Sequence, residues 1–414
     1  LARAMASAAG SPAWPPARWD LDALTAAGLY FHPDLAVARA SWAAAQAARL
    51  TAGERPNPTV APGPGYNAST PAGAITPWIL NLSLDFTIET AGKRQARISQ
   101  AAHLGDAARF ASAGAAWRIR ADIRQALLDL FAATEAAALL ERQGSMSDTN
   151  LALFQRQLDA GEISAFQLSQ ARLQSDAIRL SAADASRQRE EARARLATAI
   201  GVPGAALDGI VFDMTRFREL PPALPDEAAR RGALVNRADV IGALAAYEAS
   251  QAALQLEIAR QYPDLHLGPG YQMDQNSQKW TLLFPLALPV FSRNRGPIAE
   301  AEARRTEAAA QVDAVQARAL GAIDLATAAY RETLAKVTAA DGLVADLTRT
   351  AAVARRQLAA GAISRLDLGI LELELATREL ARLDAAVQAQ QALGAVEDAL
   401  QMPATLPSIP ELRP

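Results

Sequence analysis

The sequence predicts a mainly α protein with a small β part, made of duplicated helix–β-hairpin–helix units. Three observations support this prediction. Two segments alternate apolar and polar residues with a period of two, as a strand with one apolar and one wet face does. A long Ala-rich segment with helical spacing follows each of them. Short motifs then recur in the same order in both halves of the chain.

The duplication divides the chain into repeats. Gly63-Pro64-Gly65-Tyr66 recurs unchanged at 268–271, and the turn Ala-Gly-x-Ile-Ser occurs at 160–164 and again at 360–364. We therefore expect five parts: an extended N-terminal arm at 1–19, a first structural repeat at 20–201, a Pro-containing connector at 202–232, a second repeat at 233–403 and a C-terminal tail at 404–414.

Each repeat is expected to contain one β-hairpin, at about 57–90 in the first and at about 263–292 in the second. The apolar positions of the two alternating segments are Leu80, Leu82, Leu84, Phe86 and Ile88, then Leu282, Phe284, Leu286, Leu288 and Val290. The polar positions are Asn81, Ser83, Asp85, Thr87 and Thr281.

A helical hairpin follows each β-hairpin. The segment from about Lys93 to Asp159 has helical spacing, and at 1.5 Å per residue it would be roughly 100 Å long. That length calls for a coiled-coil or α-barrel explanation. The hairpin tips are expected at about 159–164 and 359–364, where Gly161 ends one helix and Ser164 caps the next.

Composition excludes several classes of function. The formal net charge of −3 offers no basic stripe for nucleic acid. There is no Cys, hence no disulfide framework or thiolate metal site, and the three His residues are far apart in sequence. We find no phosphate loop, nucleophile motif or metal-ligand spacing, so we predict no enzyme, no catalytic residue, no cofactor and no metal site.

Four predicted strands are too few for a closed membrane barrel, for which about eight is the minimum. An open sheet edge in lipid would leave backbone groups unsatisfied. If the apolar faces meet lipid, several chains must therefore share one barrel, with the polar positions lining a wet lumen. The alternative is a soluble α+β protein with half-buried strands, which leaves the long helices with no obvious core to cover.

At this point the residues resemble a known family, the TolC-like outer-membrane efflux channels of Gram-negative bacteria. Within it, they are most similar to the CzcC-type branch that serves heavy-metal efflux pumps. The resemblance covers about 20–403 and rests on these segments: Ala52–Pro58, Glu89–Arg94, Leu288–Gly296 and the two Ala-Gly-x-Ile-Ser turns. The branch is usually lipidated on an N-terminal Cys or simply exported, and a sequence without Cys does not support a lipid anchor.

The resemblance implies a homotrimer, in which a twelve-stranded transmembrane β-barrel continues into a twelve-helix periplasmic α-barrel. It implies an outer-membrane location with the helices in the periplasm. The implied partners are outer-membrane lipid, a periplasmic adaptor (membrane fusion) protein and an inner-membrane RND-type pump. By the same analogy the connector 202–232 forms an equatorial belt around the tunnel.

The resemblance also implies roles for individual residues. The adaptor-docking tips would comprise Gly161, Ile163, Ser164, Gly361, Ile363 and Ser364. Asp367 and Arg365 would form a gate at the periplasmic entrance, with a solvated helix position as the simpler interpretation of Asp367. Charged residues gather where strands become helices and are expected to keep polar side chains at the membrane edge: Glu89, Lys93, Arg94, Arg293 and Arg295.

The sequence and the resemblance together predict a passive outer-membrane exit duct of a tripartite, proton-driven efflux pump that exports heavy-metal cations. Drugs or a type I secretion substrate are the alternative cargoes. A soluble coiled-coil scaffold is the alternative from another class of protein, and it leaves the alternating strands unexplained.

Overall fold

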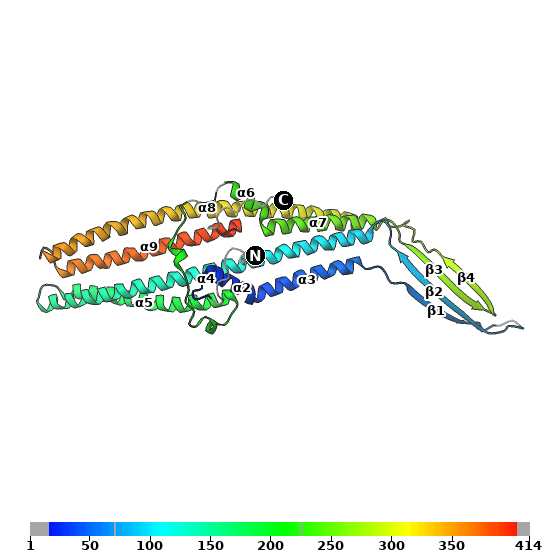
Figure 1. Cartoon of the computed structure of the whole chain (residues 1–414), viewed down its shortest axis with the longest axis horizontal. Helices are drawn as coiled ribbons and strands as arrows, with labels where there is room; N and C mark the ends of the chain where they lie inside the picture. The colour runs from blue at the N-terminus through cyan, green and yellow to red at the C-terminus, as the bar shows by residue number, and fades with distance from the viewer. Residues whose placement is uncertain (1–15, 70–71, 223, 226, 404–414) are drawn as a thin grey trace. The chain divides into compact units, whose positions relative to one another are not determined.

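A computed structural model describes residues 16–69, 72–222, 224–225 and 227–403 (Figure 1). Most of the predicted arm and the whole predicted tail lie outside the described residues. The chain divides into two compact units, one containing 1–36, 114–237 and 318–414, the other 37–113 and 238–317. Each unit therefore combines segments from both halves of the sequence.

The helices of the chain are α2 (Leu21–Phe31), α3 (Pro33–Gly53), α4 (Lys93–Asp159), α5 (Ala165–Ile200), α6 (Glu227–Asn236), α7 (Ala238–Ala259), α8 (Arg295–Ala359) and α9 (Arg365–Leu400). The strands are β1 (Thr59–Tyr66), β2 (Trp78–Ile88), β3 (Leu265–Asp274) and β4 (Ser277–Leu283). Two short 3-10 helices, η1 (Gly204–Leu207) and η2 (Thr215–Arg218), lie in the connector.

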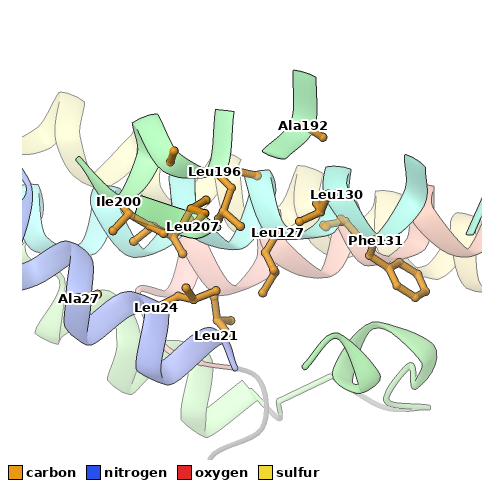
Figure 2. Packing of buried hydrophobic residues seen from close by; sticks show 14 of the residues in the cluster. Leu21, Leu24, Ala27, Leu127, Leu130, Phe131, Ala192, Leu196, Ile200 and Leu207 are labelled. Atoms are coloured by element: carbon orange, nitrogen blue, oxygen red, sulfur yellow. The ribbon is translucent and has the colours of Figure 1, made fainter. Parts of the chain in front are cut away.

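In the first unit, the main core joins α2, α4 and α5. Figure 2 shows Leu24, Leu127 and Leu196 from these three helices pointing toward one another, and each is at most 1% exposed. Leu207 of η1 and Phe217 of η2 belong to the same cluster. Full burial of one such side chain contributes about 1.5–3 kcal/mol, so this cluster anchors the connector to the helices.

Gly201 shows why α5 ends where it does. Its φ of 84° is left-handed, and its N–H bonds to Ala197 O at 3.0 Å. A Cβ at this position would lie 2.8 Å from the Cα of His32, at the junction between α2 and α3. Only glycine satisfies both the backbone angle and this close approach.

The N-terminal side of α2 is tied to the connector. Trp19 forms an isolated parallel bridge with Phe212, with Trp19 N–H donating to Val211 O and Asp213 N–H to Trp19 O, both at 2.9 Å. The carboxylate of Asp20 then caps α2 by accepting from Ala23 N–H at 2.8 Å.

The two long helices, α4 with 67 residues and α8 with 65, confirm the length that the helical spacing predicts. Alanine is the main small residue at their buried positions, for example Ala137 of α4 at 2% exposed and Ala351 of α8 at 0%. Small side chains allow neighbouring helix backbones to approach closely. Among the described helices, none combines the length and the apolar composition that a membrane span requires.

In the second unit, the four strands form one antiparallel sheet in the order β1-β2-β3-β4. The central pair, β2 with β3, joins the two halves of the sequence: Leu82 lies opposite Tyr271, and Phe86 opposite Leu267. Gln275 and Asn276 connect β3 to β4 in a two-residue turn, with φ of 51° and 63°. Positive φ at both positions is typical of a type I′ hairpin turn.

The second alternating segment is shorter as a strand than predicted. β4 ends at Leu283, and residues 284–294 have no strand pairing. The β3–β4 register pairs Gly268 with Leu283, so its continuation would place Pro285 opposite His266. A proline has no N–H for the ladder, and Pro289 follows four residues later. The predicted strand positions Phe284, Leu286, Leu288 and Val290 therefore lie in irregular structure.

Candidate functional site: sheet faces, strand–helix junctions and hairpin tips

The sheet has one continuous apolar face. The register places Leu82 between Pro62 of β1 and Tyr271 of β3, and Tyr271 opposite Trp280 of β4. Every second residue of β2 lies on this face, and these are the predicted apolar positions. Leu82 among them is 46% exposed, whereas Leu84 is partly buried. No other element of the described chain covers this face. A half-buried strand in the core of a soluble protein would need such a cover.

The opposite face is polar. Asn81 Nδ2 donates to Gly63 O at 3.1 Å, and the register aligns Ser83 of β2 and Thr281 of β4 on either side of Gly270. The predicted positions Asn81, Ser83, Asp85, Thr87 and Thr281 thus share one face.

His266 also belongs to the polar face. Its Nδ1 lies 3.0 Å from Asp85 Oδ2 and 3.5 Å from Thr87 Oγ1. In the sequence the three His residues are far apart, and the pairing of β2 with β3 that brings His266 beside Asp85 is not visible in local patterns. Among the described residues, no three or more His, Asp or Glu side chains come together as metal ligands would.

Both outer strands have one free edge within the described chain. β1 pairs only with β2, and β4 pairs only with β3. The outward N–H and C=O groups of β1 and β4 therefore have no ladder partner in this sheet. Exposed edges of this kind are templates for pairing with another strand.

Below the sheet, Lys93 joins two chain segments at the β2–α4 junction. It is 7% exposed, and its Nζ donates to Asp264 Oδ1 at 2.7 Å and to Tyr262 O at 2.6 Å. Thr90 N–H donates to the same carboxylate at 3.0 Å. Burial alone raises the pKa of Asp264, but the hydrogen bonds from Lys93 and Thr90 outweigh it and hold that pKa below its ordinary value.

A second ion pair stands beside this contact. Arg97 binds Glu89 through both guanidinium Nη atoms, with Nη2 3.0 Å from Oε2, and this hydrogen bonding lowers the pKa of Glu89. Arg94 Nε donates to Gly53 O at 2.6 Å, at the end of α3. The charged residues at the first junction thus bind neighbouring segments of the same chain, in addition to placing polar groups at the end of the sheet.

The second junction, between β4 and α8, is different. Asn294 adopts φ of 57°, and its Nδ2 donates to Glu257 O at 2.7 Å and to Glu257 Oε2 at 2.9 Å. Arg293 and Arg295 flank it, both exposed. Neither arginine forms an ion pair with any described residue.

The two hairpin tips in the first unit have the same geometry. Gly161 and Gly361 have φ of 78° and 75°, and each N–H donates at 2.9 Å to the carbonyl three residues before it. Ser164 and Ser364 then form capping boxes with Gln167 and Asp367. Ile163 and Ile363 are partly buried. The six predicted tip residues are therefore brought together as two equivalent turns.

Asp367 is the N3 residue of the capping box at the start of α9, with Ser364 as the N-cap. Its Oδ2 accepts from Ser364 Oγ at 2.7 Å and from Ser364 N–H at 3.0 Å, and these bonds lower the pKa of the carboxyl. Asp367 is nevertheless exposed, so it presents an ionised carboxylate to solvent. Arg365 is exposed two residues earlier and makes no ion pair within the described chain.

Sequence reasoning missed a buried charge network in the first unit. Glu397 of α9, 1% exposed, lies 3.1 Å from Arg120 Nη1, 3.4 Å from Arg124 Nε and 3.5 Å from Arg216 Nη2. Gln390 Nε2 adds bonds to Phe217 O at 3.1 Å and Glu219 O at 2.7 Å. The network pins the connector to α4 and α9. Its one signal in the sequence is the pair Arg120 and Arg124, spaced by one helical turn within an apolar stretch.

Comparison with known proteins shows what this architecture is similar to. Residues 29–202 match the family described as outer membrane efflux protein. The fold is shared with the outer-membrane channel OprN (TM-score 0.75, 20% identity, 92% of this chain and 89% of that one). It is shared equally with CusC (TM-score 0.74, 18% identity, 95% of each chain), whose crystal structures describe transmembrane channel formation. The predicted resemblance to outer-membrane efflux channels is confirmed.

Among curated proteins, the chain is similar to the cobalt-zinc-cadmium resistance protein CzcC of Cupriavidus metallidurans. The two are 28% identical over 217 residues, which is 51% of this chain and 50% of CzcC. The chain thus matches about half the length of that relative. The predicted outer-membrane location is confirmed, and the relatives are channel and efflux proteins rather than enzymes, as predicted.

Proposed function

We propose that the protein is the outer-membrane exit duct of a tripartite, proton-driven efflux pump, that it works as a homotrimer and that its cargo is heavy-metal cations. The observation that carries this proposal is the open four-stranded sheet, with two unpaired edges and an exposed apolar face. An open edge is not stable in lipid, and four strands are too few to close.

Three copies would supply twelve strands if β4 of one copy paired with β1 of the next. The apolar residues of β2 and Leu282 of β4 would then face lipid, followed by the irregular apolar segment 284–290, and Asn81, Ser83, Asp85, Thr87 and Thr281 would line the lumen. The alternation of apolar and polar residues across the sheet supports this assignment. The long helices would continue the barrel as a twelve-helix α-barrel in the periplasm, with the connector as its belt.

The hairpin tips are the proposed docking site for a periplasmic adaptor, which would link the duct to an inner-membrane pump. The two tips share one backbone geometry, since both are Schellman-type turns followed by a capped helix. Their side chains differ in charge, with Glu162 and Ala165 in the first tip where Ala362 and Arg365 stand in the second. Asp367 and Arg365 are the proposed gate residues. The exposed, ionised carboxylate of Asp367 would give three negative charges around a threefold axis, which favours cations.

The name of the CzcC relative, a cobalt-zinc-cadmium resistance protein, favours metal cations over drugs or a secreted polypeptide. The cargo is tested by deleting the gene and restoring it on a plasmid. We expect lower tolerance to cobalt, zinc and cadmium salts in the deletion strain and recovery on complementation. Unchanged metal tolerance together with lost drug tolerance would contradict metal export and favour a drug duct. If the deletion changed neither metal tolerance nor drug tolerance, and the protein were found in soluble fractions, the scaffold alternative would be favoured.

A further inference from the structure

An exposed apolar segment lies between β4 and α8. Leu288 is 67% exposed, Val290 70%, and Phe291 is fully exposed. Single exposed apolar residues are ordinary, but three within four positions, next to the sheet's base, form a surface that needs cover. The paired part of β4 has already ended at Leu283, so this segment contributes no ladder within its own sheet.

Basic side chains follow immediately after the apolar ones. Arg293 and Arg295 are exposed and form no ion pair with a described residue. A residue with left-handed φ directly precedes the helix at both junctions, Gly92 at 73° in the first and Asn294 at 57° in the second. There, however, Lys93 is buried on Asp264. Equivalent positions thus hold an internal cation in one repeat and an outward cation in the other.

The carboxylate that contacts the second junction is already engaged. Glu257 accepts from Asn294 and is paired with Arg260. The bonds from Asn294 hold the turn on α7, so the two flanking arginines project from a fixed backbone. Their charges are therefore available to a partner outside the chain.

Two partners fit an exposed apolar and basic segment at this place: a second copy of the chain, or membrane lipid. In the proposed trimer, the β1 edge of a neighbour would lie beside β4. The strand β1 itself, Thr59–Tyr66, contains no Asp or Glu, so its edge offers no carboxylate to Arg293 or Arg295, and the nearest acidic residue before it is Glu54. A lipid phosphate does, because a guanidinium binds phosphate oxygens in a bidentate manner.

We propose that the β4–α8 junction is a binding site for anionic phospholipid, in which Arg293 and Arg295 hold the head-group phosphate and Phe291 enters the acyl region. The inference rests on the proposed membrane function. Arginine next to exposed aromatic and aliphatic residues matches the chemistry of a membrane–water interface. Each basic side chain near an anionic membrane surface raises the binding affinity roughly five-fold.

The test uses the full chain with Phe291→Trp as a local reporter, reconstituted in vesicles of phosphatidylcholine with phosphatidylglycerol. One of the two lipids carries brominated acyl chains, and quenching by each is measured relative to the parent protein without the reporter. We expect phosphatidylglycerol to be enriched around the reporter several-fold above its mole fraction. Arg293→Gln with Arg295→Gln should remove the enrichment, and Arg293→Lys with Arg295→Lys should keep most of it.

The matched control is Arg318→Gln with Arg331→Gln. These two arginines are also exposed on α8 and unpaired within the described chain, at least 23 residues beyond Arg295 (318 − 295). The control should leave the enrichment intact. An equal enrichment with and without Arg293 and Arg295 would overturn the proposal.

Two further results separate this inference from the proposed function. A trimer whose reporter is quenched by neither lipid would mean that a second copy covers the segment, and only the lipid site would fall. A protein that does not insert into vesicles at all would overturn both the site and the membrane duct.

Discussion

Replacing Glu397 by Gln tests whether the buried charge network holds the connector on its helices. Gln keeps the shape of the side chain but removes its charge, which leaves Arg120 and Arg124 buried beside a neutral group. Burial already lowers the pKa of Arg124, and the charge of Glu397 counteracts only part of that effect. The guanidinium groups are thus substantially desolvated.

Removing one partner of a buried ion pair costs about 3–5 kcal/mol. We expect the lower end, about 3 kcal/mol, because the Arg216 side chain is 31% exposed and can rehydrate. For a unit of this size, 1 kcal/mol shifts the melting temperature by about 2–4 °C, so the predicted drop is about 6–12 °C. The assay is thermal unfolding of the detergent-solubilised protein, followed by circular dichroism.

Glu135→Gln is the matched control. Glu135 pairs with Arg218 at 2.7 Å and also joins α4 to the connector, but the two side chains are 37% and 65% exposed. An exposed pair of this kind contributes about 0–1 kcal/mol, which predicts a shift below about 4 °C. If Glu397→Gln lowers the melting temperature no more than Glu135→Gln does, the network does not stabilise the connector in the way that we infer.

Three other predictions follow from the junctions and tips. Gly201→Ala should lower stability by about 1–3 kcal/mol, because a left-handed φ and the 2.8 Å approach to His32 both oppose a Cβ; an unchanged melting temperature would contradict this. The pKa of Asp264 is lower in the folded state, so the ionised carboxylate stabilises the fold fully above the ordinary pKa of Asp and loses this effect as the pH falls below that value. Asp264→Asn should therefore flatten the acid side of a plot of melting temperature against pH. Asp367→Ala should weaken cation preference in single-channel recordings, and unchanged selectivity would remove Asp367 from the gate.

Local sequence patterns predict the hairpin tips and the strand β2 well. Both tips depend on contacts between residues at most five positions apart, made around a glycine with positive φ and a serine that caps the next helix. The period-two pattern likewise identifies β2, because each face of a strand is uniform whichever strand lies beside it. What such patterns predict is local backbone geometry.

Contacts between distant segments were not predictable in the same way. The pairing of β2 with β3, the bond between Lys93 and Asp264 and the network around Glu397 each join residues more than 150 positions apart. A single sequence gives no register for such contacts. The early end of β4 is a different case, since Pro285 and Pro289 are visible in the sequence and the apolar alternation obscured their effect.

The shared barrel is tested most directly by the molar mass of the protein, purified from membranes in detergent and measured by light scattering with correction for bound detergent. We predict three chains of 43.7 kDa, about 131 kDa of protein, in a particle that precipitates when detergent is withdrawn. A monomer or dimer that stays soluble in plain buffer would mean that the apolar face of the sheet does not meet lipid, and it would contradict the duct.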